Sequence, residues 1–248
     1  MKRMHLAVLG FAAAALLALP TTTRAAINKG IEGSLHDFST NSSWNTRKGV
    51  CSACHSAHNT DPNQIAPLWN HATTTGPFTP YNSPTFNAGP HQPGGVSLAC
   101  LSCHDGTVAI NQNLSGTVSG TNGPVYIDPG AVISADLHTT HPISFTYDSA
   151  LAAADSGGLE DPSVYKIGDP KTALTISVAP VPATWAGTSL TGKTIDQALL
   201  IGGKMECASC HDVHKQEGSS PESGILVRIS GNDTTGRGST LCRTCHIK

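Results

Sequence analysis

The chain has 248 residues, of which 25 are glycine, 16 are proline and only 5% are aromatic, and its formal net charge is −2. This composition leaves few large side chains for an ordinary protein core, so we expect a non-protein group to fill the interior. The acidic balance argues against nucleic acid as a partner.

The first 25 residues have the layout of a secretory signal peptide. Lys2 and Arg3 precede the apolar run LAVLGFAAAALLALP, and small residues follow at Ala25 and Ala26. The apolar run is shorter than the roughly 20 residues that span a bilayer, and no later segment comes closer. We therefore predict an exported protein without a membrane span, extracellular or at the cell surface, or alternatively periplasmic. Without residues 1–25 its formal charge is −5, because 12 Lys and Arg remain against 17 Asp and Glu.

All eight cysteines fall in four C-x-x-C pairs, and a histidine directly follows each pair. In a C-x-x-C-H motif the two thiols form thioether bonds to one haem, and the next imidazole is the proximal ligand of its iron. We predict four covalently attached c-type haems. The predicted attachment residues are Cys51, Cys54, Cys100, Cys103, Cys207, Cys210, Cys242 and Cys245. The predicted proximal ligands are His55, His104, His211 and His246.

Disulfides and zinc are the alternative uses of these cysteines. An exported disulfide scaffold has no need of a histidine beside each pair. Zinc ribbons also use paired C-x-x-C knuckles, but the gap from Cys54 to Cys100 is far longer than the usual spacing of about 15 to 20 residues. The histidine that follows every pair favours haem over both alternatives.

The opposite face of each iron needs either a second protein ligand or an open position. Met205 is the only methionine outside the predicted signal peptide, and it is too close to Cys207 to reach over its own haem. Histidines are sufficient for four bis-histidine haems, because seven non-proximal ones remain outside the signal peptide. These are His36, His58, His71, His91, His138, His141 and His214.

CSACHSAH and CASCHDVH place His58 and His214 three residues beyond a proximal histidine. On a helical turn this spacing puts the two imidazoles about 5 to 6 Å apart on one face, so the second imidazole must ligate a different haem. We predict four distal ligands, with His138 as an alternative to His141 and with His71 and His91 as solvent-facing or hydrogen-bonding residues. The predicted distal ligands are His36, His58, His141 and His214.

The motifs repeat in order, which predicts a di-haem module used twice. A histidine, a C-x-x-C-H-x-x-H motif and a C-x-x-C-H motif follow one another in residues 26–130 and again in 131–248, with the glycine-rich LSGTVSGTNGP near the divide. We expect one compact unit, mostly irregular coil with short α-helices at the haem motifs and little β-structure, wrapped around a chain of four haems. Weak patterns predict strands at 172–180 and 225–230 and a short helix in 194–203.

Beyond the cysteine motifs, several further stretches carry a family resemblance: HDFS, PLWNH, YNSPT, CLSCHDGTVA and HPISF. With these, the sequence resembles the multihaem cytochromes with doubled C-x-x-C-H motifs, including tetrahaem surface cytochromes of metal-reducing bacteria that polymerise into conductive filaments. The resemblance implies low-spin bis-histidine haems in a continuous chain, with one distal histidine donated across a subunit boundary. One departure is the spacer from His141 to Cys207, which greatly exceeds that from His36 to Cys51.

Three functions are compatible with four haems. The first is a polymerising extracellular electron conduit, which is not an enzyme and exchanges electrons with other cytochromes or extracellular acceptors. The second is a monomeric periplasmic electron shuttle. The third is a multihaem reductase, which needs one haem with an open position. The surplus of histidines and the absence of a C-x-x-C-K motif argue against the reductase.

The duplication also predicts how a filament would form. If His214 reaches back to the first haem of its own chain, then His58 should reach back to the corresponding haem of a preceding unit. A neighbouring subunit can supply that haem, most simply the third one, attached at Cys207 and Cys210. Such a head-to-tail contact is heterologous and propagates as a fibre. His36 would then serve the second haem and His141 the fourth.

Overall fold

The structure is a computed structural model that describes residues 31–41, 43–63, 66–120, 123–169, 184–185, 188–214, 227–229 and 240–247. The predicted signal peptide and the predicted strand at 172–180 lie outside these residues. Among the described residues, no helix has the length and apolar character needed to cross a bilayer.

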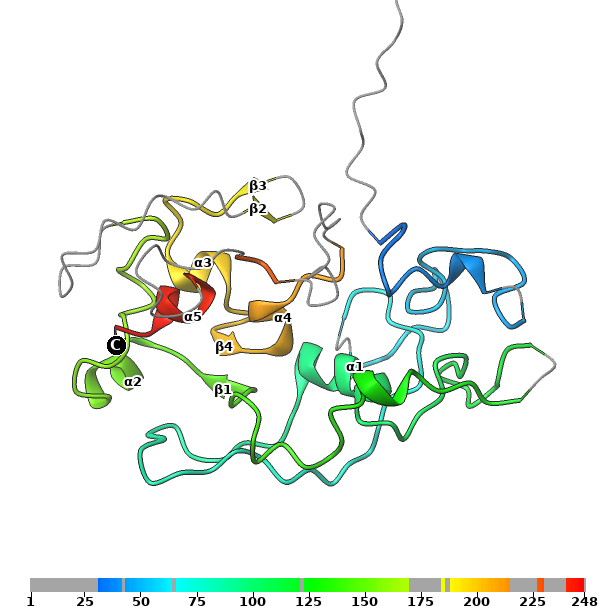
Figure 1. Ribbon diagram of the computed structural model, residues 1–248, viewed down its shortest axis with the longest axis horizontal. Coiled ribbons are helices and arrows are strands. Elements are labelled where there is room, and N and C mark those ends of the chain that lie inside the picture. The colour runs from blue at the N-terminus through cyan, green and yellow to red at the C-terminus, as the bar shows by residue number, and fades with distance from the viewer. Residues whose placement is uncertain are drawn as a thin grey trace, which may run out of the picture.

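Regular structure is short and scattered through the described part of the chain (Figure 1). The helices are η1 (Phe38–Thr40), α1 (Gly95–His104), η2 (Pro129–Ala131), α2 (Ser149–Ala154), α3 (Ile195–Ala198), α4 (Cys207–Cys210) and α5 (Thr240–Cys245). The strands are β1 (Phe145–Thr146), β2 (Thr184–Trp185), β3 (Thr188–Ser189) and β4 (Lys204–Met205). Three of these helices, α1, α4 and α5, contain a C-x-x-C pair.

Two antiparallel strand pairs complete the regular structure of the described residues. β1 pairs with β4, with Phe145 opposite Met205, and β2 pairs with β3. At the predicted strand 225–230 only Val227 to Ile229 are described, and Val227 forms an isolated antiparallel bridge with His211. Helix α3 begins after Thr194, whose backbone N–H donates to Gln197 Oε1, so it starts where the sequence predicted a helix within 194–203.

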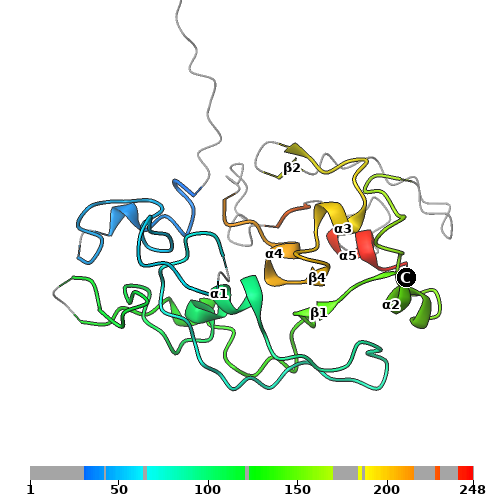
Figure 2. The same cartoon turned by 180° about the vertical axis from the view of Figure 1, so that it is seen from behind.

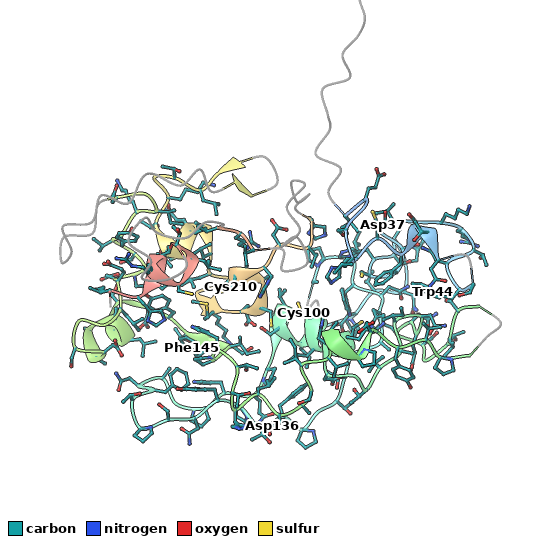
Figure 3. All side chains as sticks on the ribbon, viewed as in Figure 1. Asp37, Trp44, Cys100, Asp136, Phe145 and Cys210 are labelled. Carbon is teal, nitrogen blue, oxygen red and sulfur yellow. The ribbon has the colours of Figure 1, made fainter. Side chains whose placement is uncertain are left out.

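The buried apolar side chains form two clusters. The larger lies in the second half of the chain, where Leu190, Ile195, Leu199 and Ile229 are almost fully buried, together with Phe145. The smaller joins Phe78, Leu101 and Leu137. Figure 3 shows Phe145 on one side of the molecule and Trp44, which is also buried, on the other. Neither cluster is large, in keeping with the small number of aromatic residues.

Helices α1 and α4 lie side by side in the middle of the molecule (Figures 1 and 2). They come from different halves of the sequence and carry the second and third cysteine pairs. Helices α2, α3 and α5 lie to one side of this junction and most of the first half of the chain lies to the other, but the loop before α1 crosses to the side of α2, where Phe86 packs on Phe145 (Figure 1). The junction therefore joins the two sequence repeats.

The backbone at Gly120 lies against Ser43 and Trp44, so we expect Gly120→Ala to destabilise the fold. Gly120 has φ +91°, and a Cβ there would lie 2.7 Å from Ser43 O and 2.8 Å from Trp44 Cα. Gly116→Ala is the matched control, because Gly116 has φ +77° but a Cβ there would meet no atom within 4 Å. The control should cost about 1–2 kcal/mol of unfolding free energy, and Gly120→Ala about 1–3 kcal/mol more, as measured by denaturant unfolding. Equal losses of unfolding free energy in the two variants would contradict the close approach of the Gly120 backbone to Ser43 and Trp44.

Candidate haem-attachment sites

Each C-x-x-C-H motif forms one turn of helix. The backbone N–H groups of His55, His211 and His246 donate to the carbonyl of the first cysteine of their motif, at 2.9, 3.0 and 3.0 Å. The remaining motif, which ends at His104, lies inside α1. This turn holds two thiols and one imidazole on a short stretch of backbone, as attachment to one porphyrin requires.

None of the eight cysteines, all of which lie in the described part of the chain, forms a disulfide. Cys103 interacts electrostatically with Cys54, and Cys210 with Cys242. Across the α1–α4 junction the neighbouring thiol of Cys207, together with burial, raises the pKa of Cys100, so these two thiols are close. Figure 3 shows Cys100 and Cys210 near the centre of the molecule. Each motif therefore adjoins the next one along the chain, from first to fourth.

Burial keeps several of these thiols protonated. It raises the pKa of Cys54 to about 11, that of Cys103 to about 12 and that of Cys210 to about 11. Zinc binds thiolates, so a raised thiol pKa weakens zinc binding at neutral pH. Among the described residues, no three His, Cys, Asp or Glu side chains gather to hold a metal ion.

Three pairs of imidazoles face one another, and each contains one motif histidine. The ring centres of His36 and His104 are 6.0 Å apart, with 46° between the ring planes. His55 and His214 are 6.2 Å apart at 29°. His141 and His246 are 6.2 Å apart at 75°.

This spacing suits two imidazoles on opposite sides of one metal. A metal–imidazole bond is about 2.0–2.1 Å long, and the centre of an imidazole lies about 1.1 Å behind its bonding nitrogen. Two imidazoles bound to opposite faces of one iron therefore have ring centres about 6.3 Å apart. Each ring is free to rotate about its metal bond, so the three different plane angles are all compatible with such a pair.

Hydrogen bonds fix the tautomer of three of these histidines. A carbonyl oxygen can only accept, so Nδ1–H of His55 donates to Pro67 O at 2.7 Å. His104 donates in the same way to Ala131 O, and His141 to Pro142 O, both at 2.8 Å. In each ring Nε2 then keeps its lone pair, and a backbone carbonyl on the other nitrogen is the usual support of a metal-binding histidine.

Exposed apolar side chains flank two of the imidazole pairs. Leu35, beside His36, is 78% exposed, and Leu68, next to the carbonyl that accepts from His55, is 55% exposed. Val132 and Ile133 are also exposed and follow Ala131, which accepts from His104. A large apolar group bound between these histidines would cover such side chains, so the surroundings fit a haem as well as the donor atoms do.

His36 lies close to histidines of two C-x-x-C-H motifs. Burial lowers its pKa, and the neighbouring His104, His211 and His214 lower it further. His36 is therefore close to histidines of both the second and the third motif. A neutral imidazole in this position is suited to ligate a metal.

The other histidines are placed differently. His58 is exposed, and within the described residues its ring contacts no other aromatic ring. His71 is buried, with Nδ1 2.7 Å from Ala72 O and Nε2 3.0 Å from Ala109 O. His91 is exposed and lies 3.1 Å from Ala88 O. His138 binds Asp136 at 2.6 Å, with its side chain 61% exposed.

One buried group was not predicted from the sequence. Glu206 precedes the third motif and is only 3% exposed. Its partners Ser97 and Ser144 lie 109 and 62 residues away in the sequence, so no local pattern indicates it. The nearest sequence signal is its position directly before Cys207.

Comparison with protein-family models gives no match for the chain, and comparison with curated proteins gives none either. Ligation by the histidines, and membership of the doubled-motif cytochromes, therefore remain predictions that rest on the motifs and on the geometry described above.

The His141–His246 pair generates a test of the distal ligand that the sequence left open. His141→Ala should leave one ferrous haem per chain with an open position, so the reduced protein should take up about one equivalent of carbon monoxide. His138→Ala is the matched control and should take up no more than the wild-type protein, because the ring of His138 is directed to Asp136. The measurement is titration of the reduced protein followed by its visible spectrum. If only the His138→Ala variant took up carbon monoxide, His138 rather than His141 would be the distal ligand.

Proposed function

We propose that the protein carries electrons through four covalently attached c-type haems and catalyses no bond change. The observation that carries this proposal is the set of three imidazole pairs, 6.0 to 6.2 Å apart, each with one histidine from a C-x-x-C-H turn. A bound haem supplies an iron that exchanges one electron between its ferrous and ferric states.

The chain's own residues would hold the haems in sequence order. Cys51, Cys54 and His55 would attach the first haem, with His214 as its second ligand. Cys100, Cys103 and His104 would attach the second, with His36. Cys207, Cys210 and His211 would attach the third. Cys242, Cys245 and His246 would attach the fourth, with His141.

The arrangement of the thiols supports conduction from one end of the chain to the other. Cys54 lies near Cys103, Cys100 near Cys207 and Cys210 near Cys242, so each motif is a neighbour of the next. Haems attached at neighbouring thiols would lie close together, and the three imidazole pairs would leave no position for a substrate on the irons that they ligate. Both points favour an electron carrier over a reductase. Other cytochromes or extracellular acceptors are the expected partners.

Filament formation is the finer part of the proposal. His214, in the third motif, lies opposite His55 of the first. His58 is its counterpart in the first motif, and it is exposed. We propose that His58 ligates the third haem of a neighbouring subunit, which produces a head-to-tail homopolymer at the cell surface. A monomeric periplasmic shuttle is the outcome if no such contact forms.

Haem content and ligation provide the first test of the proposed function. Intact mass of the purified protein should show four covalently attached haems, and the reduced protein should refuse carbon monoxide, because both faces of each iron are occupied. If His58 binds only in a polymer, dissociated monomers should take up about one equivalent. A mass without haem would contradict the proposal, and full uptake by assembled protein would favour a reductase.

Replacement of His58 tests the filament. His58→Ala should retain four haems but form short filaments or none in negative-stain micrographs, because the intersubunit ligand is lost. His91→Ala is the matched control, since His91 is also exposed and stands outside the predicted ligand set. Filaments of normal length in the His58→Ala variant would contradict the role of His58 as the intersubunit ligand.

A further inference from the structure

A buried carboxylate lies between the second and third motifs. Glu206 is 3% exposed, and its Oε2 atom accepts hydrogen bonds from Ser97 N at 3.3 Å and from Ser144 Oγ at 3.0 Å. The hydroxyl of Ser97 donates to the same oxygen. Ser97 and Ser144 are themselves buried. Three donors from two distant segments thus converge on one carboxylate oxygen.

Glu206 caps helix α1 from the other half of the chain. Gly94 precedes this helix and offers no side chain, and Ser97 is the third residue of the helix. The first N–H groups of a helix lack partners within it, and a carboxylate there is stabilised by the helix dipole. Gly95 lies beside the carboxylate and has φ +50°, a backbone conformation that favours glycine.

The same network fixes the backbone of the third motif. Cys207 N donates to Ser97 Oγ at 2.9 Å, and Glu206 N donates to Ser209 Oγ at 2.9 Å. Gly94 N donates to Ser144 Oγ at 3.0 Å. The thiols of Cys100 and Cys207 are close neighbours beside this network. The attachment points of the second and third haems are therefore held together by groups bonded to Glu206.

The groups that donate hydrogen bonds to the Glu206 carboxylate are all neutral. Within the described part of the chain, no Lys or Arg forms an ion pair with it, and the groups that face it are the two serines and the two cysteine thiols. Those thiols carry no charge once they are thioethers. A buried charge acts strongly on its neighbours because little water screens it.

We propose that Glu206 is a positioning residue for the two central haems: it clamps their attachment helices together, and its negative charge lowers their reduction potentials. This inference rests on the proposed function, because it presumes that haems occupy the second and third motifs. A negative charge stabilises the ferric state, which carries one more positive charge than the ferrous state. Electrons would cross from one half of the protein to the other at this junction.

The test is a redox titration of Glu206→Gln, followed by the visible spectrum and compared with wild type. Glutamine keeps the shape and an acceptor oxygen but removes the charge, so one or both central haems should shift to a more positive potential. The expected shift corresponds to roughly a tenfold change in the equilibrium constant for reduction. Asp169→Asn is the matched control, because it removes the same charge from an exposed position and should shift no haem comparably.

Ser144→Ala provides a second variant in case Glu206→Gln does not fold. It removes one donor and leaves the charge, so the potentials of the central haems should move in the negative direction. If Glu206 had only a structural role, the two substitutions would not shift the potentials in opposite directions. The intact mass of each variant tells failure of the proposed function from failure of this inference. Protein without haem contradicts the proposed function. Protein with four haems and unshifted reduction potentials overturns only the role of Glu206.

Discussion

The backbone hydrogen bond from each motif histidine to the carbonyl of the first cysteine is the constraint on which the rest of the structure depends. It turns five residues into one helical turn that carries two thiols and an imidazole. Four such turns adjoin one another in sequence order, and the intervening chain has to bring partner histidines to them. Loops and turns are sufficient for this purpose, which explains why the helices and strands of the described residues are so short.

The local part of this arrangement could be predicted from the sequence and the long-range part could not. The C-x-x-C-H spacing indicates the turn because all its groups lie within five residues. The choice between His138 and His141 depends on tertiary contacts, and only the structure brings His141 within 6.2 Å of His246. The pairing of Phe145 with Met205 and the buried Glu206 depend on residues far apart in sequence and gave no local signal.

The protein core also differs from that of an ordinary domain of this length. The buried apolar side chains form two modest clusters, while Leu35, Leu68 and Ile133 remain exposed beside histidines. Burial of apolar surface stabilises a fold in proportion to its area, and these side chains contribute little while they face water. Haems at the histidine pairs, as proposed, would cover these side chains and add to the buried apolar area.

The two halves of the chain are interlocked rather than merely adjacent. His214 of the second half lies against His55 of the first, and Glu206 caps a helix that begins before residue 100. Contacts of such large sequence separation carry the entropy cost of closing a long loop, so they tend to form late in folding. Neither repeat makes these contacts alone, so we expect the two halves to fold as a single cooperative unit.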